Sequence, residues 1–127
     1  MANFIKVAHR GSSGSYPENT RLAFEKAIEA GADMIEMDCR LSKDGHVVVI
    51  HDDRLDRTAR AKGFVKGKTL KQLKKLDVGT WHKKSFKGER ILTLEEILEI
   101  VSGKVEINLE IKSVLRGPLG IELKVLF

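Results

Sequence analysis

Two histidines and two acidic residues stand where apolar runs of this chain end. His9 and His51 each follow such a run, and Glu36 and Asp38 close another. In α/β folds, ligands gather at the carboxyl ends of the strands. The sequence therefore predicts that these four side chains share one site.

A third carboxylate belongs with this group. Glu110 lies in an alternating segment near the end of the chain, and Lys112 follows it at strand spacing. Glu36, Asp38 and Glu110 would offer a hard divalent cation three oxygen donors, so we expect Mg²⁺ or Ca²⁺. The alternative is that exposed carboxylates on an edge strand only keep it soluble.

The histidines predict acid–base chemistry near neutral pH, with one imidazole accepting a proton and the other donating one. The alternative is that His9 and His51 are hydrogen-bonded structural residues. His46 and His82 do not stand beside an acidic cluster at the end of a strand, and we assign them no role.

Two cationic side chains stand beside these residues. Arg10 is next to His9, and Lys112 is two positions after Glu110. Both could bind an anionic phosphoryl group and stabilise its developing charge, which points to a phosphoester substrate. As an alternative, each is a surface counterion to a neighbouring acid.

Apolar periodicity predicts the elements that carry these residues. A long polar insertion, residues 54–92, separates the third strand from the last helix, and an apolar segment after Pro118 predicts a further helix. The third strand returns either as a hairpin that pairs Asp38 with residue 50 or in a parallel arrangement. The expected strands are 4–7, 33–39, 47–50 and 105–111, and the expected helices are 20–30, 70–76 and 94–101.

This order predicts an α/β fold, and four strands are half of an eight-stranded barrel. At 127 residues, we expect a single domain over 1–127. Without a membrane-length apolar stretch or a signal segment, the sequence predicts a cytoplasmic protein with no stable membrane insertion. The lone Cys39 is expected to fill a strand position.

The net charge of +5 is unevenly distributed. Residues 60–90 carry eleven Lys and Arg against two acids, a net charge of +9 that leaves −4 for the remainder. Such a segment could attract anions, lipid surfaces or nucleic acid. Because it holds only three aromatic residues and no known binding motif, nucleic acid is not expected as a partner.

A series of short motifs extends over nearly the whole chain. They are His9-Arg10-Gly11, Pro17-Glu18-Asn19-Thr20, residues 31–38, Lys43-Asp44-Gly45, His51-Asp52, Leu55-Asp56-Arg57-Thr58 and Glu110-Ile111-Lys112. In these motifs and their order the chain resembles the glycerophosphodiester phosphodiesterases.

The resemblance implies a TIM-type barrel that hydrolyses glycerophosphodiesters, with a divalent metal, to an alcohol and sn-glycerol 3-phosphate. It implies the same roles for the residues named above: His9 and His51 as the acid–base pair, Glu36, Asp38 and Glu110 as metal ligands, and Arg10 and Lys112 as phosphate-binding residues.

Members of that family have about 250 residues, the usual size of an eight-stranded barrel. The chain is therefore expected to form about half a barrel of four strands with a small helical insertion. Because such a half leaves strand edges open, we expect a homodimer or a fragment of a longer protein. The alternative function is a truncated, catalytically silent half-barrel that acts as a phosphate-binding or assembly module.

Overall fold

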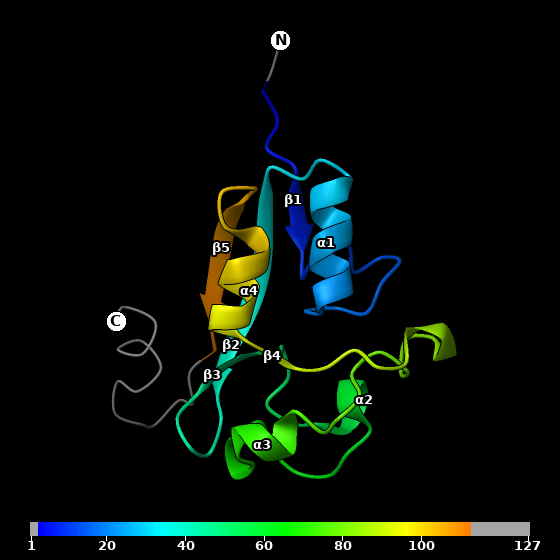
Figure 1. Ribbon diagram of the computed structural model, residues 1–127, viewed down its shortest axis with the longest axis vertical. Coiled ribbons are helices and arrows are strands. Elements are labelled where there is room, and N and C mark those ends of the chain that lie inside the picture. The colour runs from blue at the N-terminus through cyan, green and yellow to red at the C-terminus, as the bar shows by residue number, and fades with distance from the viewer. Residues whose placement is uncertain (1–2, 113–127) are drawn as a thin grey trace.

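A computed structural model describes residues 3–112, which form a sheet around one long strand. This strand, β2 (Met34–Leu41), pairs in parallel with β5 (Glu106–Ile111) along one edge. On its other edge, its first residues pair in parallel with β1 (Val7–His9). The carboxyl ends of β1 and β5 therefore point the same way, toward the lower part of the molecule in Figure 1.

The second half of β2 pairs with an antiparallel hairpin. Strand β3 (Val47–Val49) returns along β2, with Cys39 opposite Val49, and the Ile50 N–H donates to the Asp38 carbonyl at 2.9 Å. The hairpin alternative is thus confirmed, with the expected pairing of Asp38 and residue 50. A fifth short strand, β4 (Leu92–Thr93), pairs antiparallel with β3.

The expectation of a four-stranded half-barrel is confirmed only in part. The sheet has five strands over the described residues, and β1, β2 and β5 are the ones joined in parallel. The third expected strand turned back because the short Lys43–Gly45 turn allows a tight hairpin, with the Ser42 N–H donating to the His46 carbonyl at 2.9 Å.

Two helices, α1 (Arg21–Glu29) and α4 (Leu94–Val101), pack together against one face of the sheet (Figure 1). Their apolar stripes meet the alternate residues of β2 that point away from the acidic side chains. The core between these layers contains Phe24, Ala27, Ile35, Met37, Cys39, Val47, Val49, Leu92, Leu94, Ile97, Ile100 and Val101.

Helix α4 begins with a capping box. The Thr93 hydroxyl accepts from the Glu96 N–H, and the Glu96 carboxylate accepts from the Thr93 N–H. Thr69 and Gln72 form the same arrangement at α3 (Leu70–Leu73). Thr followed three residues later by Glu or Gln satisfies two free N–H groups at a helix start.

Replacing Thr93 with alanine is expected to lower the free energy of unfolding by about 1 kcal/mol, because the Glu96 N–H loses its acceptor. Chemical denaturation followed by circular dichroism measures the change. Ser85→Ala, at an exposed residue of the insertion, serves as control and should change stability by less than about 0.5 kcal/mol. Equal losses in the two variants would contradict the capping role.

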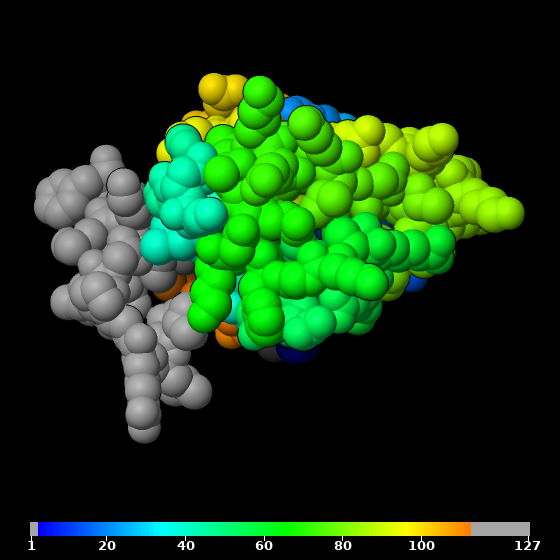
Figure 2. Space-filling model, turned by 90° about the horizontal axis from the view of Figure 1, so that it is seen from below, coloured from blue at the N-terminus to red at the C-terminus, as the bar shows by residue number. Residues whose placement is uncertain are grey.

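The insertion is more ordered than its polar composition suggests. It holds α2 (Asp56–Ala59), α3 and two 3₁₀ turns, Val65–Gly67 and Lys84–Phe86. It lies at the end of the molecule to which β1 and β5 point, and its atoms cover much of that face in Figure 2. Its own small core contains Val48, Ile50, Leu55, Ala59, Val65, Leu73, Val78 and Ile91.

The expectation of a buried strand over residues 4–7 was wrong. Phe4 and Ile5 are exposed at 84% and 66%, and β1 starts only at Val7, which is 50% exposed. The apolar residues favour a strand, but pairing needs a partner, and the register with β2 begins where Val7 meets Met34.

Cys39 is fully buried in the strand as expected, and burial raises the pKa of its thiol to about 12. The helix expected after Pro118 lies outside the described residues. Among residues 3–112, none of the helices has the length and apolar character that crossing a bilayer requires.

Candidate active site

Three carboxylates meet beside the middle of β2, where the neighbouring strands β1 and β5 end. Along β2, Glu36 and Asp38 point to the face opposite the helices, because side chains of a strand alternate. The register of β5 places Glu110 beside Asp38. Carboxylate oxygens of Glu36, Asp38 and Glu110 all lie within 4.8 Å of one another. The structure thus brings together the three residues that the sequence predicts as metal ligands.

The donor set fits a hard cation. Within residues 3–112, Glu36 Oε1 and Asp38 Oδ1 are buried without a hydrogen-bond partner, although buried polar atoms are seldom left unpaired. Burial and the nearby charge of Asp38 raise the pKa of Glu36, a sign that the acids repel one another here. A divalent cation would satisfy both oxygens and offset the repulsion, and Mg²⁺ and Ca²⁺ prefer oxygen ligands. The cluster could therefore hold a metal ion.

Arg10 and Lys112 border this cluster. Arg10 Nε is 3.4 Å from Asp38 Oδ2, and Lys112 Nζ is 3.8 Å from Asp38 Oδ1. Lys112 also bonds Glu110, and this bond lowers the pKa of Glu110. Both cations therefore lie where they could contact an anion bound beside the acidic cluster.

The turn after β1 places Arg10 through its backbone. Arg10 has a left-handed φ of 58°, and its N–H donates to both the carbonyl (2.9 Å) and Oε2 (3.1 Å) of Glu36. Gly11 follows with φ 79°, and a Cβ there would come within 2.8 Å of the Ala23 backbone. Only glycine lets the turn pack this tightly against α1.

The two histidines approach from different strands. Nε2 of His9, at the end of β1, lies 3.7 Å from Glu36 Oε2, and this side chain is 64% exposed. His51, after β3, is less exposed at 30%, and its Nδ1 is 2.7 Å from Asp52 Oδ1. Its backbone carbonyl accepts from Arg40 Nε at 2.8 Å.

The partner of His51 determines which ring nitrogen carries the proton. The hydrogen bond from Arg57, followed by that from His51, lowers the pKa of Asp52 despite the opposing effect of burial. An ionised carboxylate only accepts hydrogen bonds, so the Nδ1 of His51 is the donor. Nε2 of the neutral imidazole is then left as the basic nitrogen.

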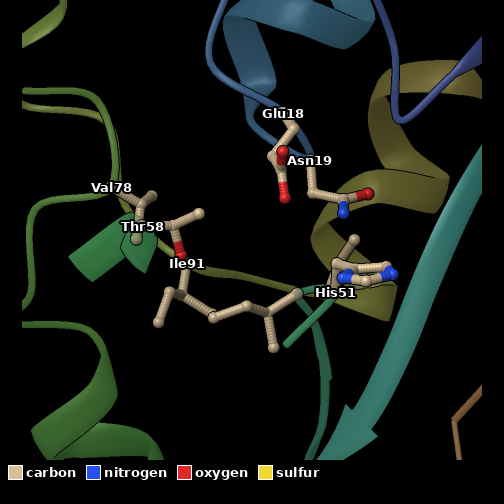
Figure 3. Close-up of a pocket in the computed structure, with 8 residues that line it drawn as sticks. Glu18, Asn19, His51, Thr58, Val78 and Ile91 are labelled. Carbon is tan, nitrogen blue, oxygen red and sulfur yellow. The ribbon is translucent and has the colours of Figure 1, made fainter. Parts of the chain in front are cut away.

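Sequence reasoning assigned no role to four residues that the structure places at this site. Asn19, with φ 55°, is buried and donates from Nδ2 to Asp38 Oδ2 at 3.0 Å. Glu18 and Asn19 line a small pocket opposite His51, with Thr58 of the insertion on a third side (Figure 3). Glu18, Asn19, Asp52 and Arg57 all lie in motifs that carry the family resemblance, which was the available signal.

Arg57 bridges two of these acids. It donates to both oxygens of Asp52 and to both oxygens of Glu18. Burial opposes ionisation of Glu18, yet bonds from Arg57 and the charge of Arg10 leave its pKa below the ordinary value. Both acids are therefore better stabilised as anions in the folded protein than in the unfolded chain.

Arg57→Gln is expected to lower the free energy of unfolding at pH 7 by about 1 kcal/mol, a modest value because the side chain is 41% exposed. The folded-state pKa values of Asp52 and Glu18 are depressed, so their stabilisation is fully present above the unfolded pKa values, near 4. It is lost as the pH falls through the folded values. The difference between wild type and variant should therefore shrink between about pH 5 and pH 2.

Denaturant titrations across this pH range measure that difference. Arg54→Gln is the matched control, because Arg54 pairs with Asp56 on the exposed surface and its loss should cost little at any pH. A deficit in Arg57→Gln that stays constant down to pH 2 would contradict the assignment.

Comparison with known proteins identifies the family of this chain. The model of the glycerophosphoryl diester phosphodiesterase family matches residues 9–117. A glycerophosphodiester phosphodiesterase of Caldanaerobacter subterraneus subsp. tengcongensis is 51% identical over 123 residues, which cover 96% of this chain and 51% of the relative. One from Bacillus subtilis is 42% identical over 117 residues, 86% of this chain and 40% of the relative.

Solved structures share the fold of this chain. A glycerophosphodiester phosphodiesterase from Agrobacterium tumefaciens superimposes with a TM-score of 0.84 at 40% identity, over 87% of this chain and 48% of that one. An Oleispira antarctica phosphodiesterase in complex with its product sn-glycerol-3-phosphate gives 0.81 at 42% identity, over 84% and 43%. The chain spans about half the length of the curated relatives it matches. It belongs to the glycerophosphoryl diester phosphodiesterase family.

Proposed function

We propose that this chain hydrolyses glycerophosphodiesters to an alcohol and sn-glycerol 3-phosphate, using a divalent metal and two histidines. The observation that carries the proposal is the convergence of Glu36, Asp38 and Glu110 within 4.8 Å, beside the end of β1, which carries His9. The product bound in the Oleispira structure supports a small phosphoester as the ligand class.

Each charged residue has a role that follows from its position. Glu36, Asp38 and Glu110 would hold Mg²⁺ or Ca²⁺, which, when bound, polarises a phosphoryl oxygen as a Lewis acid. Arg10 and Lys112 would bind phosphoryl oxygens and stabilise negative charge that develops on them.

The histidines supply the proton transfers. One imidazole accepts the proton of the attacking hydroxyl, and the other donates a proton to the oxygen of the leaving alcohol. His51 suits the base role through its free Nε2, because Asp52 holds the other ring nitrogen as a donor. The same residues serve either water or a neighbouring glycerol hydroxyl as the nucleophile, the latter giving a cyclic phosphate first.

An assay on the full chain with glycerophosphocholine tests the proposal. We expect release of sn-glycerol 3-phosphate with Mg²⁺ or Ca²⁺, its loss with a chelator, and recovery when metal is restored. Binding of glycerophosphocholine without turnover would contradict hydrolysis and support the alternative, a catalytically silent phosphate-binding or assembly module. A diester without a free hydroxyl separates the two nucleophiles, since only water can attack it.

We also propose that two copies of the chain associate. Within residues 3–112, β1 and β5 each pair on one edge only, both with β2, and Phe4 and Ile5 are exposed near one of them. Open edges and exposed apolar side chains favour pairing with another chain. Light scattering should show a dimer, whereas a well-folded monomer would contradict this proposal.

A further inference from the structure

The Arg57 guanidinium donates four hydrogen bonds, although its side chain is 41% exposed. Nε and Nη2 donate to the two oxygens of Asp52 at 2.9 and 3.0 Å. Nη1 and Nη2 donate to the two oxygens of Glu18 at 3.0 and 2.6 Å. Two forked pairs on one planar group fix both carboxylates in orientation as well as in charge.

One of these carboxylates is the partner of His51. Asp52 Oδ1 receives Nη2 of Arg57 at 3.0 Å and faces Nδ1 of His51 at 2.7 Å. Arg57 makes no hydrogen bond to His51 or to the acidic cluster over the described residues. The hydrogen-bonded route from Arg57 to the imidazole therefore runs through Asp52.

The insertion holds Arg57 in place. The guanidinium carbon lies 5.3 Å from the centre of the Trp81 ring, close enough for a cation–π contact. The indole is itself anchored, because its Nε1 donates to the Val78 carbonyl at 3.0 Å. Arg57 thus joins the loop before α1, the segment just after β3 and the part of the insertion around Trp81.

We propose that Arg57 is a positioning residue that, through Asp52, fixes the ring orientation of His51 and the proton on its Nδ1. This inference rests on the proposed function, in which His51 transfers a proton. Without the fork, Asp52 can rotate away from the imidazole, and the ring loses the partner that selects its tautomer. The basic Nε2 would then face the substrate in only part of the molecules.

Three variants of the full chain separate this role from a structural one. Arg57→Gln removes the charge and the fork. Arg57→Lys keeps a cation beside Trp81 but cannot form forked pairs of hydrogen bonds with both carboxylates. This variant remains informative if Arg57→Gln does not fold. Arg54→Gln is the matched control, because Arg54 lies on an exposed surface and bonds Asp56.

Nitrogen-15 NMR reads the His51 tautomer directly, without metal or substrate, and the signal is assigned by its loss in His51→Ala. We expect the Nδ1-protonated form in wild type and Arg54→Gln, and a shift toward the Nε2-protonated form in Arg57→Gln. Arg57→Lys should lie between them. An unchanged tautomer in both Arg57 variants would overturn the inference, whether or not the chain hydrolyses glycerophosphocholine.

Steady-state kinetics provide the second readout. Removing a residue that positions a reacting group through another commonly costs about 10- to 100-fold in activity, so kcat of Arg57→Gln should fall by that factor while KM stays within about twofold. A rise in KM with unchanged kcat would overturn the inference, because it would place Arg57 in contact with substrate. A wild-type chain without turnover would contradict the proposed function alone, since the tautomer measurement still decides the role of Arg57.

Discussion

His51→Ala is expected to lower kcat/KM for glycerophosphocholine by about 100- to 10,000-fold, the usual contribution of a positioned acid or base. His51 is the histidine whose ring is held by a neighbour, with Nδ1 at 2.7 Å from Asp52. Its loss removes a proton acceptor and leaves the acidic cluster intact. Metal binding by the variant, followed by calorimetry, should therefore equal that of wild type.

His46→Ala is the control for this experiment. His46 lies beyond the Lys43–Gly45 turn, with Nε2 at 3.8 Å from Asp44, and belongs to no part of the site. Its turnover should match wild type. Activity in His51→Ala within about threefold of wild type would refute the base role, and a weakened metal affinity would show that the imidazole binds the ion instead.

The second large effect concerns Glu36. Glu36→Gln should lower the affinity for Mg²⁺ or Ca²⁺ by more than about 100-fold. Replacing even a residue that only hydrogen-bonds a metal ligand lowers metal affinity by about 10- to 100-fold. Wild-type protein at a metal concentration 100 times its Kd gains about 2.7 kcal/mol of stability from binding. The variant should gain almost none under the same conditions.

Without metal, Glu36→Gln should be at least as stable as wild type. Glu36 and Asp38 repel one another on one buried face, and burial together with this charge raises the pKa of Glu36. A neutral glutamine removes the repulsion and can still accept from the Arg10 N–H. Thermal melts of both proteins, with and without metal, measure the effect.

Glu29→Gln is the matched control, since this carboxylate is 69% exposed on α1 and pairs only with Lys26. It should show the same metal-induced gain as wild type. If Glu36→Gln keeps that gain, the cluster is not the metal site.

Local chemistry made much of the fold predictable. The capping boxes at Thr69 and Thr93 follow from residue types three positions apart, and both are present. The shared face of Glu36 and Asp38 was also predictable, because side chains alternate along a strand wherever it pairs. Both features depend on neighbours within a few residues.

Features that depend on distant partners were not predictable. The run 4–7 has good strand formers, yet most of it lies exposed, because pairing with β2 begins only at Val7. In the sequence Arg57 is one more cation. Its role depends on hydrogen bonds to Glu18, which lies 39 residues earlier. The orientation of the third strand was also undecided between two geometries until the β2 register was known.

Strand β3 contributes side chains to two separate hydrophobic cores. Val47 and Val49 pack in the core under the helices, whereas Val48 between them packs in the core of the insertion. Amide protons on either side should thus exchange as distinct cooperative units, with β3 as the joint. His51 follows Ile50, which packs in the core of the insertion, so opening of that unit is expected to displace the imidazole while the core under β2 stays closed.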